Sequence, residues 1–188
     1  MKSNLTPVAE LYVRHGSVQK VKMEAAALTS WDLTQRQICD LELLMNGGFS
    51  PLTGFLTESD YNSVVENMRL KNGNLWPMPI TLDVSQDFAD SLEIDQNIAL
   101  RDQEGVILAT IIITDMWQPN KKREAEMVFG ADDLAHPAVD YLYNQAVQFI
   151  WVAQSPEFNN RCIMIFATAA TRQTSCALIF VKWVGAGL

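Results

Sequence analysis

Side chains suited to nucleophilic or metal chemistry are few in this sequence. It holds two histidines, His15 and His136, so a Ser/His or Cys/His pair has few possible members. His136 precedes Pro137 in LAHPAV, and we expect it to fix a turn. The cysteines form no CxxC pair and have no histidine at ligand spacing; they are Cys39, Cys162 and Cys176. An odd number with this spacing predicts neither a zinc site nor a disulfide framework.

Paired carboxylates are the next candidates, because two acids held together can serve as general acid and general base. Asp40 and Glu42 stand two apart in a predicted helix, so their side chains point in different directions. The acids further along show no spacing that places a pair on one helix face; they are Asp83, Asp87, Asp90 and Asp95. An independent hydrolase that uses Asp83 or Asp115 is kept as an alternative.

A glycine-rich loop, NGGFSPLTGFL (residues 46–56), invites comparison with loops that bind phosphate. Its first two glycines follow a predicted helix, however, and the C-terminal end of a helix dipole repels anions. No lysine follows them, unlike in a P-loop. We interpret the loop as a connection in which Gly47 and Gly48 end one helix and Ser50-Pro51 turns the chain. Phe49 and Phe55 are expected to anchor it in the core.

Two capped helices flank this loop. In residues 33–48, Thr34 and Gln37 form a predicted capping box, and an apolar stripe follows at helical spacing. Residues 57–70 repeat the scheme, with Thr57 as the N-cap and Leu56 and Tyr61 as a hydrophobic staple.

Strand-like segments follow these helices. Residues 79–85, 96–102 and 105–117 are rich in β-branched side chains, with a hairpin turn at 102–105. Pro119 then opens a short helix that ends at Gly130. Helices followed by a meandering antiparallel sheet predict an α+β domain, organised as a small half-open β-barrel with flanking helices.

The composition limits the partners. The 188 residues are 48% hydrophobic and 19% charged, and the net charge is −8. Nucleic acid is not expected as a partner, because phosphate binding needs a basic face. The basic run Lys121-Lys122-Arg123 is followed by Glu124 and is interpreted as a solvated helix face. Without a secretory signal pattern or an apolar run of membrane-spanning length, we expect no membrane partner and a cytoplasmic location.

Five ordered blocks between about residues 25 and 145 resemble one enzyme family, the ATP sulfurylases (sulfate adenylyltransferases). The blocks are SWDLTQRQICDLELLMNGGFSPLTGFL, DYNSVVENMRL, LWPMPITLDV, ITDMWQPNKKREAEMVFG and HPAVDYL. The resemblance is to the N-terminal domain of the family. It implies a PUA-like fold, which in the family is joined to a nucleotidylyltransferase domain of Rossmann-like α/β type.

The resemblance also implies an activity for the parent enzyme. The family transfers the adenylyl group of MgATP to sulfate, which gives adenosine 5′-phosphosulfate and pyrophosphate, and the parent is expected to be a homo-oligomer. Its catalytic groups lie in a Gln-x-Arg-Asn-Pro-x-His-x-x-His segment of the second domain, and neither His15 nor His136 matches this segment. We therefore assign no catalytic, cofactor-binding or metal-binding residue to this chain. ATP and sulfate would be bound only through the second domain, so the expectation is an inactive fragment. The alternative is a non-catalytic binding or assembly module.

The composition changes after residue 146. Residues 147–188 hold three basic side chains, Arg161, Arg172 and Lys182, against the single acid Glu157. The tail can also be read in a shifted frame, in which the third base of each codon is joined to the first two bases of the next codon. In that frame RCIMIF (161–166) can encode Val-His-Tyr-Asp-Phe, which resembles the family. We therefore divide the chain into a domain of residues 1–146 and a tail of residues 147–188. The tail is interpreted as an out-of-frame translation that is poorly ordered and prone to aggregation. Divergence, a different extension, and genuine strands at FIWVA and CALIFVKWV stay open.

Overall fold

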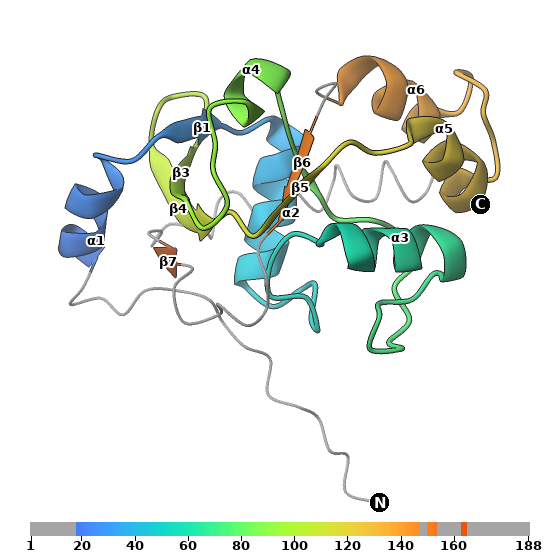
Figure 1. Cartoon of the computed structure of the whole chain (residues 1–188), viewed down its shortest axis with the longest axis horizontal. Coiled ribbons are helices and arrows are strands. Elements are labelled where there is room, and N and C mark those ends of the chain that lie inside the picture. The colour runs from blue at the N-terminus through green and yellow to red at the C-terminus, as the bar shows by residue number, and fades with distance from the viewer. Residues whose placement is uncertain (1–17, 147–149, 154–162, 165–188) are drawn as a thin grey trace, which may run out of the picture.

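The computed structural model describes residues 18–146, 150–153 and 163–164, and the account that follows is confined to them. Figure 1 shows a central helix, α2, with one small sheet beside it and a second sheet on its other side. Helix α1 (Val18–Ala25) lies at one end of the molecule, and α5 and α6 lie at the other.

Helix α2 (Gln35–Met45) begins as the sequence predicts. Thr34 Oγ1 accepts a hydrogen bond from Gln37 N at 3.3 Å, and Gln37 Oε1 accepts one from Thr34 N at 2.9 Å. The predicted capping box is therefore confirmed. Leu33 and Ile38, which flank this N-terminus, are both buried in the same hydrophobic cluster.

Helix α3 (Glu58–Asn67) also has its predicted N-cap, because Thr57 Oγ1 accepts from Asp60 N at 3.3 Å. The helix ends earlier than predicted. Met68 adopts the left-handed conformation with φ 54°, and a hairpin-like turn follows in place of the expected helix to residue 70.

The first sheet has the strand order β1-β3-β4-β7. Its strands are β1 (Ser30–Asp32), β3 (Asn97–Arg101), β4 (Ile107–Ile112) and β7 (Ile163–Met164). β3 and β4 form the predicted antiparallel hairpin, whereas β1 pairs with β3 in parallel. The expectation of a purely antiparallel meander is therefore wrong. The long connection between β1 and β3 permits the parallel arrangement, which a tight turn could not.

The second sheet has the order β2-β6-β5 and is antiparallel. Its strands are β2 (Leu82–Val84), β6 (Ile150–Ala153) and β5 (Asp115–Trp117). The run 105–117, predicted as one strand, is divided between β4 and β5, which belong to different sheets. Neither sheet closes on itself among the described strands, and the predicted α+β class with an open sheet is confirmed.

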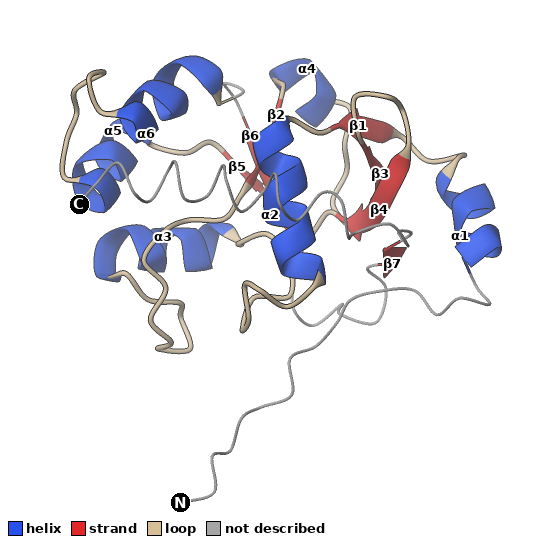
Figure 2. Ribbon diagram, turned by 180° about the vertical axis from the view of Figure 1, so that it is seen from behind, coloured by secondary structure: helices blue, strands red, loops and turns tan. Residues whose placement is uncertain are grey.

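The remaining helices are short. Helix α4 (Gln86–Ala89) is capped by Ser85 and follows β2. Helix α5 (Lys121–Glu124) continues into the π-helical segment η2 (Ala125–Phe129), which stops at Gly130 with φ 66°, as predicted for that glycine. Helix α6 (Pro137–Asp140) likewise continues into the π-helical segment η3 (Tyr141–Gln145). Figure 2 shows α5 and α6 side by side at one end of the molecule, which agrees with Figure 1.

Two large hydrophobic clusters account for most of the core in the described part of the chain, and a small third one lies under α1. The larger lies between α2, β2, β3 and β4 and contains Phe49 and Phe55, so the predicted anchoring of the glycine-rich loop is confirmed. The smaller packs α3 against β5, η2, α6 and η3. Leu52 and Trp76 contact both clusters and join them.

The region after residue 146 is described only in part. β6 lies between β2 and β5, and β7 pairs with β4, at two points of the segment expected to be poorly ordered. The other residues of that segment lie outside the described ranges, so the division at residue 146 stays a prediction. Within the described part, no helix is long and apolar enough to cross a membrane.

Candidate functional site

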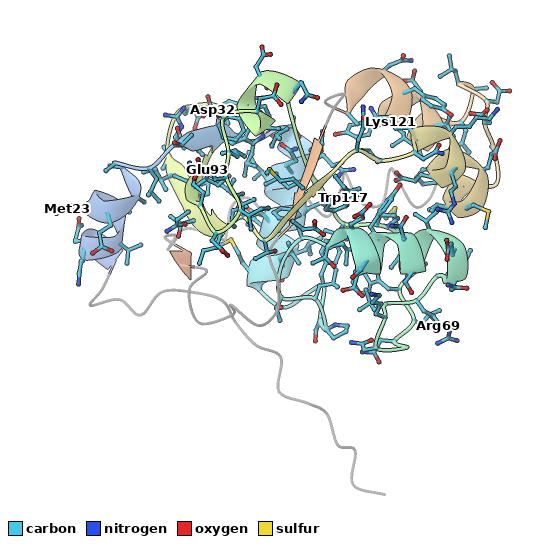
Figure 3. The ribbon with its side chains drawn as sticks, viewed as in Figure 1. Met23, Asp32, Arg69, Glu93, Trp117 and Lys121 are labelled. Atoms are coloured by element: carbon cyan, nitrogen blue, oxygen red, sulfur yellow. The ribbon has the colours of Figure 1, made fainter. Side chains whose placement is uncertain are left out.

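Ionisable and polar side chains gather where α2, α3, α5, η3 and β2 meet. We call them the buried polar cluster. Its members are Arg36, Gln37, Asp40, Tyr61, Asp83, Lys121, Glu124 and Tyr141. Figure 3 marks the α5 end of this cluster with the label on Lys121.

Gln37 and Asp83 connect α2 to β2. The Gln37 amide Nε2 donates to the Asp83 carbonyl oxygen at 2.7 Å and to the Asp83 carboxylate Oδ1 at 2.9 Å. Both residues are almost completely inaccessible to solvent, with 0% and 1% exposed. Since an unpaired buried polar group costs about 1–3 kcal/mol, the amide and the carboxylate satisfy each other in this position.

Arg36 extends the connection to two carboxylates. Its Nε lies 3.4 Å from Asp40 Oδ2, and its Nη2 lies 4.0 Å from Asp83 Oδ1. The guanidinium also lies over the Tyr141 ring, 5.1 Å from the ring centroid, in a cation–π contact. Burial raises the pKa of the Asp40 carboxyl, and Arg36 opposes this without cancelling it. Arg36 therefore ties α2 to both β2 and η3.

Tyr61 and Glu124 connect α3 to α5. The Tyr61 hydroxyl donates to Glu124 Oε2 at 3.0 Å, and both side chains are buried. Burial raises the pKa of Glu124 to about 7, because it disfavours the ionised form more than Tyr61, Arg36 and Lys121 favour it. Burial also raises the pKa of Tyr61.

The sequence predicted that Lys121 lies on a solvated helix face, and for this residue the prediction is wrong. Its Nζ donates to the Ala146 carbonyl oxygen at 3.3 Å, and burial lowers its pKa while Asp83 and Glu124 oppose the shift. Lys122 behaves as predicted: it is exposed and lies 3.9 Å from both Glu126 and Asp132. Adjacent helical residues point in directions about 100° apart, so one lysine of the run faces inward and the next faces solvent.

The acids that the sequence suggested are not brought together as a catalytic pair. Asp83 lies on β2 and Asp115 on β5, with β6 between the two strands. Asp115 Oδ2 instead accepts a hydrogen bond from Glu58 N at 2.9 Å and so caps α3. Asp87, Asp90 and Asp95 are exposed. Over residues 18–146 and the two short segments beyond, no three His, Cys, Asp or Glu side chains are grouped to hold a metal ion.

A hollow of about 140 Å³ opens beside the glycine-rich loop. Residues 51–57 line it together with Asp60, Leu70 and Asn72. The N-terminus of α3 contributes to this wall, but two of its amide donors are already used: Glu58 N by Asp115 and Asp60 N by Thr57. The carboxylate of Asp60 adds a negative charge. The hollow is therefore unsuited to a phosphate, which agrees with the interpretation of the loop as a connection.

The histidine and the cysteine that lie within the described residues, His136 and Cys39, have structural roles. His136 Nδ1 accepts from Ala138 N at 3.2 Å and caps α6, which confirms its expected role in a turn. Cys39 is buried on α2 and is disulfide-bonded, although the sequence predicts no disulfide framework. His15, Cys162 and Cys176 lie outside the described residues.

Sequence reasoning missed Arg36, Lys121 and Glu124 as parts of one cluster. A signal was present for Glu124, because it shares a helix face with Val128, four residues on, and Val128 packs on the smaller core cluster. For Arg36 the local signal was its i,i+4 spacing to Asp40, whereas its partners on β2 and η3 are distant in the sequence.

Comparisons with known proteins agree with this architecture. A sulfate adenylyltransferase from Kluyveromyces lactis is 51% identical over 143 residues, covering 74% of this chain and 28% of that protein. The Saccharomyces cerevisiae protein of the same name is 50% identical over 123 residues, covering 65% and 24%. The match to the Mycosarcoma maydis sulfate adenylyltransferase is 43% identical over 173 residues and covers 87% of this chain, so it extends past residue 146.

A solved structure described as a hexameric APS kinase from Thiobacillus denitrificans superimposes with a TM-score of 0.60 at 26% identity. That match covers 93% of this chain and 30% of the other. The chain thus spans about 24–30% of the length of these relatives. A model of the PUA-like domain family matches residues 2–150. By its sequence and its open α+β architecture, this chain belongs to the PUA-like domain family.

Proposed function

We propose that this chain is the N-terminal PUA-like part of a sulfate adenylyltransferase and that it does not catalyse the reaction by itself. The observation that carries the proposal is the identity of about half of the aligned residues with enzymes of that name, over only a quarter of their length. The parent reaction would join the adenylyl group of ATP to sulfate and release pyrophosphate.

The buried polar cluster supports the proposal that this chain does not catalyse the reaction by itself. Adenylyl transfer needs cationic donors aimed at the phosphates, to stabilise the charge that develops on the leaving pyrophosphate. The two cations of the cluster, Arg36 and Lys121, face carboxylates of the same cluster instead. The two cations of this cluster are therefore not directed at a phosphate, and in this proposal ATP and sulfate bind to a second domain.

An assay of pyrophosphate release tests the proposal directly. Purified chain is incubated with ATP, Mg²⁺ and sulfate, and the full-length S. cerevisiae sulfate adenylyltransferase serves as the positive control. We expect release at the rate of the reaction without protein. Sulfate-dependent release above that rate, which is lost after heat denaturation of the chain, would contradict the assignment.

The origin of residues 147–188 forms a separate part of the proposal. We infer that they are translated out of frame, from the change in charge at residue 146 and the family-like string in the shifted frame. The coding DNA tests this inference: its shifted frame must encode Val-His-Tyr-Asp-Phe where the given frame reads RCIMIF (161–166). The Mycosarcoma match extends past residue 146, and codons that encode no such string would rule the frameshift out.

A second candidate function is an assembly module. The structural neighbour is described as hexameric, and this chain matches 30% of it. Light scattering on a gel-filtration column separates the candidates. A stable oligomer at micromolar concentration favours the assembly module, and a monomer favours the isolated domain fragment.

A further inference from the structure

Glu124 stands at the junction between two parts of the molecule. It lies at the end of α5, immediately before η2, and only 6% of it is exposed. Its side chain reaches Tyr61 on α3, 63 residues earlier in the chain, through the 3.0 Å hydrogen bond. η2 packs against α3 and α6, so this bond lies within the contact that holds the C-terminal helices to the rest of the domain.

The charges around Glu124 come from four elements. Tyr61 faces it from α3, Arg36 from α2, Asp83 from β2, and Lys121 from its own helix. The cluster as a whole contains two cations, Arg36 and Lys121, and two other carboxylates, Asp40 and Asp83. Ionisation of Glu124 adds a further negative charge beside Asp83 in a site that solvent hardly reaches, while the nearby cations are Arg36, Lys121 and Arg123, the last of which faces Tyr61. An uncompensated buried charge is strongly unfavourable.

We propose that Glu124 is a proton-controlled clasp between α5 and α3: its burial beside Tyr61 favours the packed arrangement while Glu124 carries a proton, and loss of the proton favours exposure of the carboxylate to water, although Tyr61 stays a donor to it. The raised pKa of about 7 places this loss near neutral pH. The clasp also lies close to the end of η3. Lys121, three residues before Glu124, donates a hydrogen bond to the carbonyl oxygen of Ala146, the residue that follows η3.

The sign of the pH dependence follows from the raised pKa. The folded chain keeps the Glu124 proton up to about pH 7, whereas an ordinary Glu loses it near 4.5. The stabilisation from Glu124 is therefore fully present below about 4.5 and is lost as the pH rises through about 7.

Urea unfolding of the wild type and the Glu124→Gln variant across pH 5 to 8.5 tests the clasp. Glutamine keeps a neutral acceptor for Tyr61 but has no proton to lose. We expect the ratio of the two unfolding constants, wild type over variant, to rise on the order of tenfold to a hundredfold over this range. The matched control is Glu126→Gln, an exposed acid two residues away, whose profile should run parallel to that of the wild type. Parallel profiles for Glu124→Gln as well would overturn the proposal.

Two measurements on the wild-type chain keep the test decisive if the variant fails to fold. The ¹³C shift of the Glu124 side-chain carboxyl should titrate with a midpoint near 7, and a midpoint near 4.5 would overturn the proposal. Amide exchange, corrected for its intrinsic pH dependence, should lose protection in η2 between pH 6 and 8 while β4 keeps its protection. Equal behaviour of η2 and β4 would show that no local clasp exists.

Discussion

Gln37 carries two roles at once, and both depend on its amide group. Its Oε1 completes the capping box of α2, and its Nε2 satisfies the carbonyl and the carboxylate of Asp83. Replacing it with methionine keeps the volume but removes all three hydrogen bonds. Because the carbonyl and the carboxylate of Asp83 then each lose a buried donor, we expect Gln37→Met to lower the free energy of unfolding by about 2–4 kcal/mol.

Urea unfolding with Gln35→Met as the control measures this effect. Gln35 is exposed on the same helix, so its replacement should change the free energy of unfolding by less than about 0.5 kcal/mol. Equal effects of the two substitutions would show that the amide of Gln37 contributes little beyond helix propensity.

The same residue shows what could be read from the sequence. The bond between Thr34 and Gln37 spans three positions, and a capping box has a local signature, so it was predictable. The bond from Gln37 to Asp83 spans 46 positions, and only the packing of α2 on β2 creates it. Likewise, the inward direction of Lys121 depends on which face of α5 meets the core, and a run of three basic residues does not reveal that face.

At the scale of the element, α3 ends at Met68, which adopts a left-handed backbone conformation that is unfavourable for methionine. Met68 has φ 54°, where a side chain with a Cβ is strained and glycine is not. It is 46% exposed, so little packing would be lost on its removal. We expect Met68→Gly to raise the free energy of unfolding by about 0.5–1 kcal/mol.

Met127→Gly is the matched control in thermal or urea unfolding. Met127 has nearly the same exposure, 47%, but lies within η2, where glycine is unfavourable. Its replacement should lower the free energy of unfolding by about 1 kcal/mol, the opposite sign. A loss of stability at both positions would mean that Met68 contributes packing that outweighs its backbone strain.

The sequence placed the start of α3 correctly and its end too late. Thr57 supplies a local start signal, whereas no glycine marks the stop. The helix ends where the following turn offers competing backbone bonds: Trp76 N donates to the Met68 carbonyl, and Leu70 N donates to the Asn74 carbonyl. β1 was missed for a related reason, because three residues are too short to show a strand period and its partner β3 is remote in the sequence.

At the scale of the whole molecule, the second sheet depends on a strand beyond the predicted domain boundary. β2 and β5 each pair with β6, and the described structure shows no ladder between β2 and β5 themselves. The open sheet was predictable from the order of helices and strands. The position of β6 was not, because the change of composition at residue 146 argued for the end of the domain there.

Two shortened chains test where the domain ends. A chain that stops at residue 153 keeps β6, and one that stops at residue 146 removes it. All three residues of β2 are buried in the complete chain, so without β6 the strand loses both its hydrogen-bonding partner and the cover that β6 provides. We therefore expect the melting temperature of the chain ending at 146 to lie at least about 4 °C below that of the chain ending at 153. Circular dichroism during heating measures the difference. Equal melting temperatures would place the boundary at residue 146 and show that β6 adds nothing to stability, whereas the expected difference makes residues 150–153 part of the folded unit whatever reading frame produced them.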